Sequence, residues 1–121
     1  MTAKTDTRVD LDALARGLEQ LDVEAVLALY ADDLEQIEMD DKTPPSSPRV
    51  RHGRETIEQM LRACAEHGVA LRVDNLVPGE ERAALTIACE FPTGRKVVAN
   101  SILELRDGKI ARQIDVQARD A

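Results

Sequence analysis

The second half of the chain contains four runs rich in β-branched and other apolar residues, separated by short turn sequences. The runs are VALRVDNLV, RAALTIACEF, RKVVANSILEL and IARQIDVQA, and PGEE, PTG and RDGK divide them. Turns at such short intervals favour hairpins between successive strands. This half therefore predicts a meandering antiparallel sheet, and the apolar face of such a sheet needs a covering layer of helices.

The first half of the sequence supplies three predicted helices. The first follows the candidate N-cap Asp10, because leucines recur behind it at three- and four-residue spacing. The second begins near Asp22 and ends before the acidic pair at 32–33. The third runs from Arg54 to about Glu66 and ends at a glycine. Their apolar stripes are the surfaces expected to pack on the sheet.

Between the second and third helices the apolar residues change to a period of two. Ile37 and Met39 share one side of a predicted strand, whereas Leu34, Gln36, Glu38 and Asp40 share the other. The following run, DKTPPSSPRVRHG, contains three prolines and predicts a long surface loop over 41–53. This order of elements predicts an α+β fold in which a curved sheet wraps the helices.

Composition excludes several classes of protein. A formal net charge of -7 over 121 residues argues against binding to nucleic acid or to an anionic membrane. No apolar run is long enough to span a bilayer, so a cytoplasmic location is expected. Cys64 and Cys89 lie in separate apolar segments, which predicts free thiols, no metal site and no cofactor. Residues 1–8 read as a disordered arm, and 9–121 as one domain.

Three segments, LDVEAVLALYADD, HGRETI and DGKIARQIDVQ, resemble the nuclear transport factor 2-like superfamily. The resemblance is to its branch of ketosteroid isomerases and SnoaL-like polyketide cyclases. It implies a cone-shaped, cystatin-like roll in which three helices pack on a curved, mixed sheet, with a pocket at its mouth. It also implies a homodimer that pairs through the outer face of the sheet, for which Val73, Val97 and Leu103 are the apolar candidates.

The resemblance assigns candidate site residues. The general-base aspartate of ketosteroid isomerase falls on Glu38, with Asp115 as a second carboxylate. The two oxyanion donors of that enzyme fall on Leu14 and Ile102, so ketosteroid isomerase activity itself is not expected. The other expected pocket residues are Tyr30, Met60, Leu85, Ile87, Val98, Asn100, Gln113 and Gln117.

Two functions remain open at this point. One is an isomerase, cyclase or dehydratase that transfers protons on a hydrophobic, oxygenated molecule of polyketide, terpenoid or steroid-like type. The alternative is a non-catalytic ligand-binding or dimeric scaffold protein of the same fold. Epoxide hydrolysis would need a positioning arginine in the pocket, and Arg106 and Arg112 are expected to point elsewhere.

Several of these residues could instead have only a structural role, without any part in catalysis or ligand binding. Glu38 could be a solvated surface acid, and Asp115 could lie on the exposed face of the last strand. Tyr30 could be a core residue whose hydroxyl reaches a polar partner. His52 could be a partly exposed loop residue. The side of the sheet on which these residues lie decides between the two interpretations.

Overall fold

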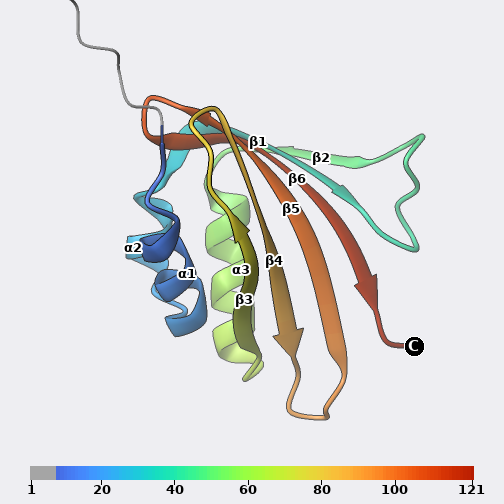
Figure 1. Ribbon diagram of the computed structural model, residues 1–121. Coiled ribbons are helices and arrows are strands. Elements are labelled where there is room, and N and C mark those ends of the chain that lie inside the picture. The colour runs from blue at the N-terminus through green and yellow to red at the C-terminus, as the bar shows by residue number, and fades with distance from the viewer. Residues whose placement is uncertain (1–7) are drawn as a thin grey trace, which may run out of the picture.

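A curved, six-stranded sheet carries three helices on its concave side (Figure 1). The computed structural model describes residues 8–121. The elements are α1 (Leu11–Gln20), α2 (Val23–Leu27), β1 (Tyr30–Met39), β2 (Arg49–His52), α3 (Glu55–Glu66), β3 (Ala70–Val77), β4 (Arg82–Glu90), β5 (Lys96–Arg106) and β6 (Lys109–Arg119).

The strands lie in the order β2-β1-β6-β5-β4-β3. Only the β1–β6 pair is parallel, and the four other pairs are antiparallel. The sheet is therefore mixed, and the predicted α+β roll and its four-stranded meander are confirmed.

Aspartate caps define the first two helices. Asp10 Oδ1 accepts the N–H of Ala13 at 3.0 Å, as the sequence predicts for α1. Asp22 Oδ1 accepts the N–H of Ala25 at 3.2 Å and begins α2 directly afterwards. Each cap satisfies a backbone donor that the helix itself leaves without a partner. The two helices thus follow one another with a single turn between them.

The predicted end of the second helix is wrong. Helix α2 stops at Leu27, and β1 already begins at Tyr30, so the acidic pair at 32–33 lies within a strand. The strand is irregular there, because the register with β6 shifts between Tyr30 and Glu35. A short apolar run such as 26–30 fits a buried helix and a buried strand equally well, which explains the error.

The predicted surface loop at 41–53 contains a strand that the sequence analysis missed. Strand β2 pairs antiparallel with β1, with His52 opposite Glu35 and Arg49 opposite Glu38. The three prolines all precede β2, so its backbone donors remain available for pairing. The hairpin extends beyond the rest of the sheet (Figure 1).

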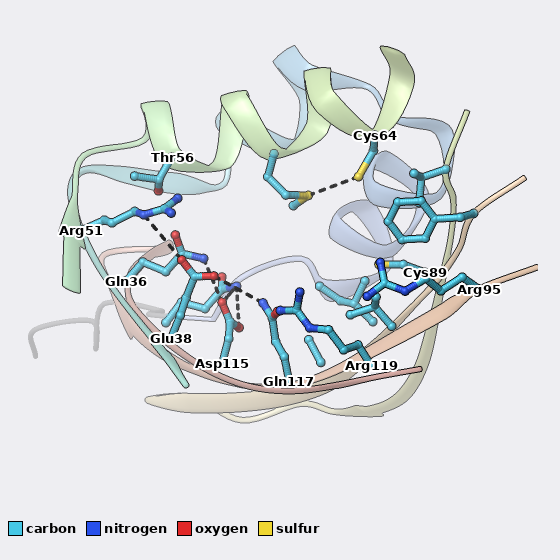
Figure 2. Close-up of a pocket in the computed structure, with 17 residues that line it drawn as sticks. Gln36, Glu38, Arg51, Thr56, Cys64, Cys89, Arg95, Asp115, Gln117 and Arg119 are labelled. Atoms are coloured by element: carbon cyan, nitrogen blue, oxygen red, sulfur yellow. Dashed lines mark hydrogen bonds and ion pairs between the residues drawn. The ribbon is translucent and has the colours of Figure 1, made fainter. Parts of the chain in front are cut away.

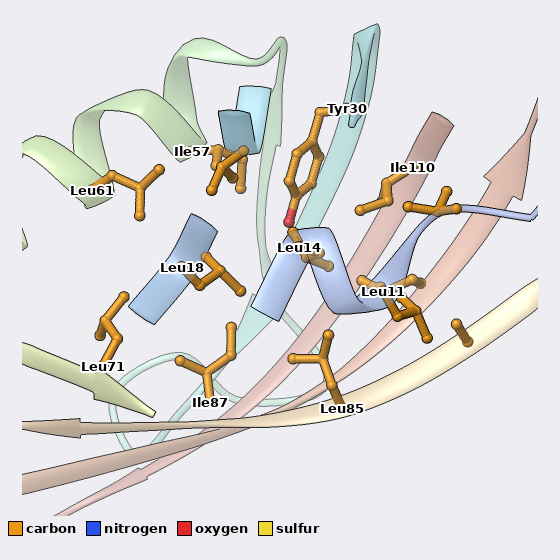
Figure 3. Close-up of a cluster of buried hydrophobic side chains, with 14 of the residues drawn as sticks. Leu11, Leu14, Leu18, Tyr30, Ile57, Leu61, Leu71, Leu85, Ile87 and Ile110 are labelled. Atoms are coloured by element: carbon orange, nitrogen blue, oxygen red, sulfur yellow. The ribbon is translucent and has the colours of Figure 1, made fainter. Parts of the chain in front are cut away.

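The core lies between the helices and the inner face of the sheet. Figure 3 shows α1 with Leu14 and Leu18 above Leu85 and Ile87 of β4. Leu14 and Leu18 are almost completely buried. Burial of one leucine side chain contributes about 1.5–3 kcal/mol, so this stripe is a main source of stability.

The phase expected for β5 is wrong by one residue. Leu103 is buried in the core, Val97 lines a pocket and Val73 packs against the core, so none of the three lies on the outer face. The outer face instead carries exposed apolar side chains that include Val98, Ile102 and Val116. Strand β5 has apolar residues on both faces, so alternation alone could not fix its phase.

The expected disordered arm at 1–8 falls outside the described residues except for Arg8. Arg8 Nη2 forms an ion pair with Glu80 Oε1 at 2.9 Å. Across residues 8–121, no helix is both long enough and apolar enough to cross a membrane.

Candidate functional site

A pocket of about 300 Å³ opens between α3 and the inner face of the sheet (Figure 2). One part of its wall is polar and comes from β1 and β6, namely Gln36, Glu38, Gln113, Asp115 and Gln117. The rest is largely apolar and includes Met60, Cys64, Val69, Ile87, Cys89, Phe91, Val97 and Ala99. Ligand sites commonly combine an apolar lining with a few convergent polar groups.

The parallel pairing of β1 with β6 creates the polar wall. Gln36 lies opposite Gln113, and Glu38 lies opposite Asp115. Alternate residues of a strand share one face, so Gln117 follows on the same side. Five polar side chains thus gather on two adjacent strands that are far apart in sequence.

Asp115 is buried and receives hydrogen bonds from three side chains. Its Oδ1 accepts from Ser101 Oγ at 2.5 Å and from Gln113 Nε2 at 3.0 Å. Its Oδ2 accepts from Gln36 Nε2 at 2.8 Å and from Gln113 Nε2 at 3.2 Å. A buried carboxylate needs such partners in place of water. The lone pairs of Asp115 are therefore largely occupied within the protein.

Tyr30 extends this network into the core. Its hydroxyl donates to Gln113 Oε1 at 2.5 Å, which orients the amide so that its nitrogen faces Asp115. Burial is the main cause that raises the pKa of Tyr30, the charge of Asp115 raises it further, and the bond to Gln113 partly opposes both. Tyr30 therefore stays a neutral donor, and its place is in the core rather than in the pocket wall.

Glu38 lines the same pocket but is bonded much more weakly. Its side chain is 16% exposed, and Oε2 accepts one long hydrogen bond from Gln117 Nε2, at 3.3 Å. Its Oε1 is buried and accepts no hydrogen bond from any residue within 8–121. The nearest cationic atom to Oε1 is Arg51 Nε of β2, at 3.7 Å. Glu38 thus keeps an oxygen that a ligand could engage.

Three arginines also line the pocket, and the sequence analysis did not single them out. Arg51 faces Glu38 from β2, Arg119 ends β6, and Arg95 lies in the β4–β5 turn. Arg119 continues the alternation of 113, 115 and 117, so the inward phase of β6 could have identified it. Arg51 could not be found that way, because its strand was predicted to be a loop.

The other predicted site residues divide into three groups. Met60, Ile87, Gln113 and Gln117 line the pocket with the two carboxylates. Leu14 and Leu85 lie in the core and do not line it. Val98, Asn100 and Ile102 lie on the outer face, contrary to the prediction, because β5 has the opposite phase.

Asn100 was expected on the wall opposite Glu38, and the structure contradicts this. It is exposed on the outer face, where its Oδ1 accepts from Thr86 Oγ1 at 2.7 Å. Ser101 holds the neighbouring inward position, next to Asp115. His52 is largely exposed, with Nε2 3.4 Å from Glu35 Oε2.

The two cysteines are free thiols, as predicted, and both line the pocket. Cys64 Sγ lies 3.8 Å from Met60 Sδ. Burial raises the pKa of both thiols, and with an added contribution from Cys64 it raises that of Cys89 to about 11. Within residues 8–121, no group of three or more His, Cys, Asp or Glu side chains is arranged to hold a metal ion.

These shifts predict slow modification of Cys89 at neutral pH. Only the thiolate reacts with iodoacetamide, and a raised pKa lowers its fraction at any pH below that pKa. We expect the alkylation rate of Cys89, followed by mass spectrometry of the folded protein, to rise steadily between pH 8 and the alkaline limit of folding. A rate that reaches half of its maximum near pH 8.5, the usual pKa of an exposed cysteine, and levels off above it would contradict the prediction.

Comparison with known proteins supports a family assignment. A family model described as a SnoaL-like domain matches residues 11–113. No curated protein matches the chain significantly. Several solved structures share the fold at low sequence identity.

One of them is a candidate ketosteroid isomerase from Kribbella flavida, with 22% identity, a TM-score of 0.68, and coverage of 92% of this chain and 76% of that one. SalBIII, an epoxide hydrolase/cyclase-like enzyme of pyran ring formation in salinomycin, has 19% identity, a TM-score of 0.65 and coverage of 89% and 87%. An LEH-like epoxide hydrolase of M. tuberculosis has 18% identity, a TM-score of 0.64 and coverage of 89% and 79%. At these identities the similarity establishes a shared fold.

Proposed function

The chain belongs to the SnoaL-like domain family, and on that premise we propose that it is a small-molecule enzyme in which Glu38 transfers a proton. The observation that carries the proposal is the buried Oε1 of Glu38, which accepts no hydrogen bond from residues 8–121 while its side chain lines the pocket. An unbonded buried carboxylate oxygen is costly in a resting protein. A bound substrate that offers an acidic C–H or O–H would give it a partner.

The two carboxylates have different roles in this proposal. Glu38 is the acid–base group, because its lone pairs are only partly engaged by Gln117 and Arg51. Asp115, the second catalytic candidate from the sequence, is a positioning residue that holds Gln36 and Gln113 through its hydrogen bonds. The amides of these glutamines border the pocket and can face a substrate oxygen.

The substrate class follows from the lining of the pocket. Side chains such as Met60, Ile87 and Phe91 favour an apolar body, and the polar wall favours oxygen substituents near Glu38. Isomerisation, cyclisation and dehydration of such a molecule all need a positioned proton acceptor or donor. The names of structural neighbours cover isomerase, cyclase and epoxide hydrolase chemistry, so they support the general class without selecting one reaction.

The proposal can be tested without knowing the natural substrate. 5-Nitrobenzisoxazole reports proton abstraction, because removal of its ring C–H proton breaks the N–O bond and releases a coloured nitrile-bearing phenolate. We expect the protein to accelerate this reaction, with saturation, beyond the rate in acetate at the same pH. A rate no higher than that of acetate, together with binding of the probe, would favour the non-catalytic alternative.

We also propose that the chain forms a homodimer through the outer face of its sheet. The exposed side chains of Val98, Ile102 and Val116 lie on adjacent strands there, and contiguous apolar surface of this kind favours burial against a partner. We expect light scattering to give about twice the 13.3 kDa mass of the chain.

Charged substitutions on two surfaces can test whether the outer face of the sheet forms the dimer interface. Ile102→Glu should shift the mass toward the monomer, because it places a charge in the apolar interface. Ala65→Glu, on the exposed surface of α3, is the control and should leave the mass unchanged. A monomeric wild-type protein at micromolar concentration would contradict the proposal.

A further inference from the structure

We infer that the substrate carries a carboxylate, which Arg95 binds at the end of the pocket away from Glu38. The inference rests on the proposed function and narrows its substrate class from hydrophobic, oxygenated molecules to those that carry a carboxylate. Three features support it: the charges of the lining, the free donors of Arg95 and the position of Arg95 relative to Glu38.

The charge of the pocket differs from that of the whole chain. The chain has a formal net charge of -7, yet three arginines, Arg51, Arg95 and Arg119, line the pocket against two acids. Cations gathered in a concave site raise the local concentration of anions. An acidic protein with such a site is suited to attract an anionic ligand there rather than over its general surface.

Arg95 differs from the other two arginines in its partners. Arg51 Nε lies 3.7 Å from Glu38, and Arg119 Nη2 donates to Asp40 at 2.8 Å. Within residues 8–121 the guanidinium of Arg95 donates only to the backbone carbonyl of Asp120, from Nε at 3.4 Å, and no carboxylate there pairs with it. Its charge is therefore not neutralised by any carboxylate of the part of the chain that the structure describes.

The guanidinium of Arg95 contacts an aromatic ring while most of its donors remain free. It lies over the ring of Phe91, with 5.9 Å between its central carbon and the ring centroid. A cation–π contact of this kind occupies no N–H group. A guanidinium has five N–H donors in a fork that matches a carboxylate, and the bond to Asp120 uses one of them.

The two ends of the pocket have opposite chemistry. Figure 2 shows Glu38 and Asp115 at one end and Arg95 at the other, with Gln117 between them along the sheet. The two acids would repel a carboxylate at their own end, because Arg51, 3.7 Å from Glu38, offsets only part of their charge. A bound acid would therefore take a single orientation, with its carboxylate on Arg95 and its reactive, oxygen-bearing end toward Glu38.

The size of the pocket limits that body. A volume of about 300 Å³ is at the lower end of the range for ligand sites. Met60, Ile87 and Val97 line the pocket and supply apolar contacts. A compact organic acid, with its reactive carbon several bonds away from the carboxylate, fits these requirements.

Matched probes can test the inference by binding alone. 3-Cyclohexylpropionate and 3-cyclohexylpropionamide have the same shape and differ in charge. Each is titrated into ¹⁵N-labelled protein, and amide shifts of pocket residues are followed by NMR. We expect the acid to bind about 3- to 10-fold more tightly than the amide, the modest range reflecting the solvent exposure of Arg95.

Two variants locate the effect. Arg95→Gln should lower the affinity for the acid to that for the amide, and added salt should weaken acid binding to the wild type only. Arg82→Gln removes another exposed arginine, one that does not line the pocket, and it should preserve the difference between the probes.

The outcomes separate this inference from the proposed function. Equal or tighter binding of the amide, or an unchanged acid preference in Arg95→Gln, would overturn the carboxylate inference and leave the role of Glu38 intact. The absence of shifts in the pocket with both probes would count against the pocket as a ligand site, and therefore against both proposals.

Discussion

Replacing Glu38 with glutamine should reduce proton abstraction from 5-nitrobenzisoxazole by about 10²- to 10⁴-fold, the usual contribution of a positioned acid–base group. The amide has nearly the same size but cannot accept a proton at this position. Only Gln117 donates to the Glu38 side chain among residues 8–121, so the change should leave the fold intact, as judged by circular dichroism.

Glu35→Gln is the matched control. Glu35 lies on the same strand, but it does not line the pocket and its Oε1 accepts from Arg112 Nε at 2.9 Å. Its replacement should leave the rate within about twofold of the wild type, since exposed ion pairs contribute little. A Glu38→Gln variant that keeps the wild-type rate would assign the proton transfer to another group and remove the basis of the proposed function.

The inward position of Glu38 was predicted through the family resemblance, because alternation alone allowed either phase of its strand. Ile37 and Met39 are apolar on the opposite side and gave the other phase equal support. In the structure Leu34 and Gln36 are buried on the same side as Glu38, which lines the pocket. The same holds for Gln113 and Asp115 of β6, both of which are buried. The structural interpretation of these acids as solvated surface residues does not fit their burial.

Strand β5 shows where this reasoning fails. Val97 and Val98 are adjacent, as are Ile102 and Leu103, so either phase gives an apolar inner face. The family resemblance implied the phase in which Asn100 points inward, whereas in the structure Asn100 points outward. A strand usually shows its buried side by an apolar face opposite a polar one. When the outer face is apolar as well, this difference is lost and the sequence does not indicate which side is buried.

The hydrogen bonds of the site join residues that are far apart in sequence, so local sequence patterns could not predict them. Gln36 and Asp115 are 79 residues apart, and their bond requires the parallel register of β1 and β6. The ion pair of Arg51 with Glu38 requires the short strand β2, whose sequence RVRH follows three prolines. Apart from β2, the order of the elements was thus predictable from local periodicity, whereas the electrostatics of the pocket followed only from strand pairing.

Replacing Asp115 with alanine should destabilise the protein by about 3–5 kcal/mol, the range seen when one partner is removed from a buried charged network. The change leaves the donors of Gln36, Ser101 and Gln113 without their acceptor in a buried site. Urea unfolding, followed by circular dichroism, measures the loss of stability. We expect a lower midpoint urea concentration, with a similar dependence of the unfolding free energy on urea concentration.

Asp32→Ala provides the comparison, since the Asp32 side chain is 89% exposed and pairs with Arg54 at 2.9 Å. An exposed pair of this kind contributes up to about 1 kcal/mol, so its loss should be small. If Asp115→Ala were as mild as Asp32→Ala, water in the pocket would be replacing the carboxylate, and Asp115 would not be a structural anchor. Asp115 would then be open to a bound molecule in the same way as Glu38, and the division of roles between the two acids would have to be reversed or abandoned.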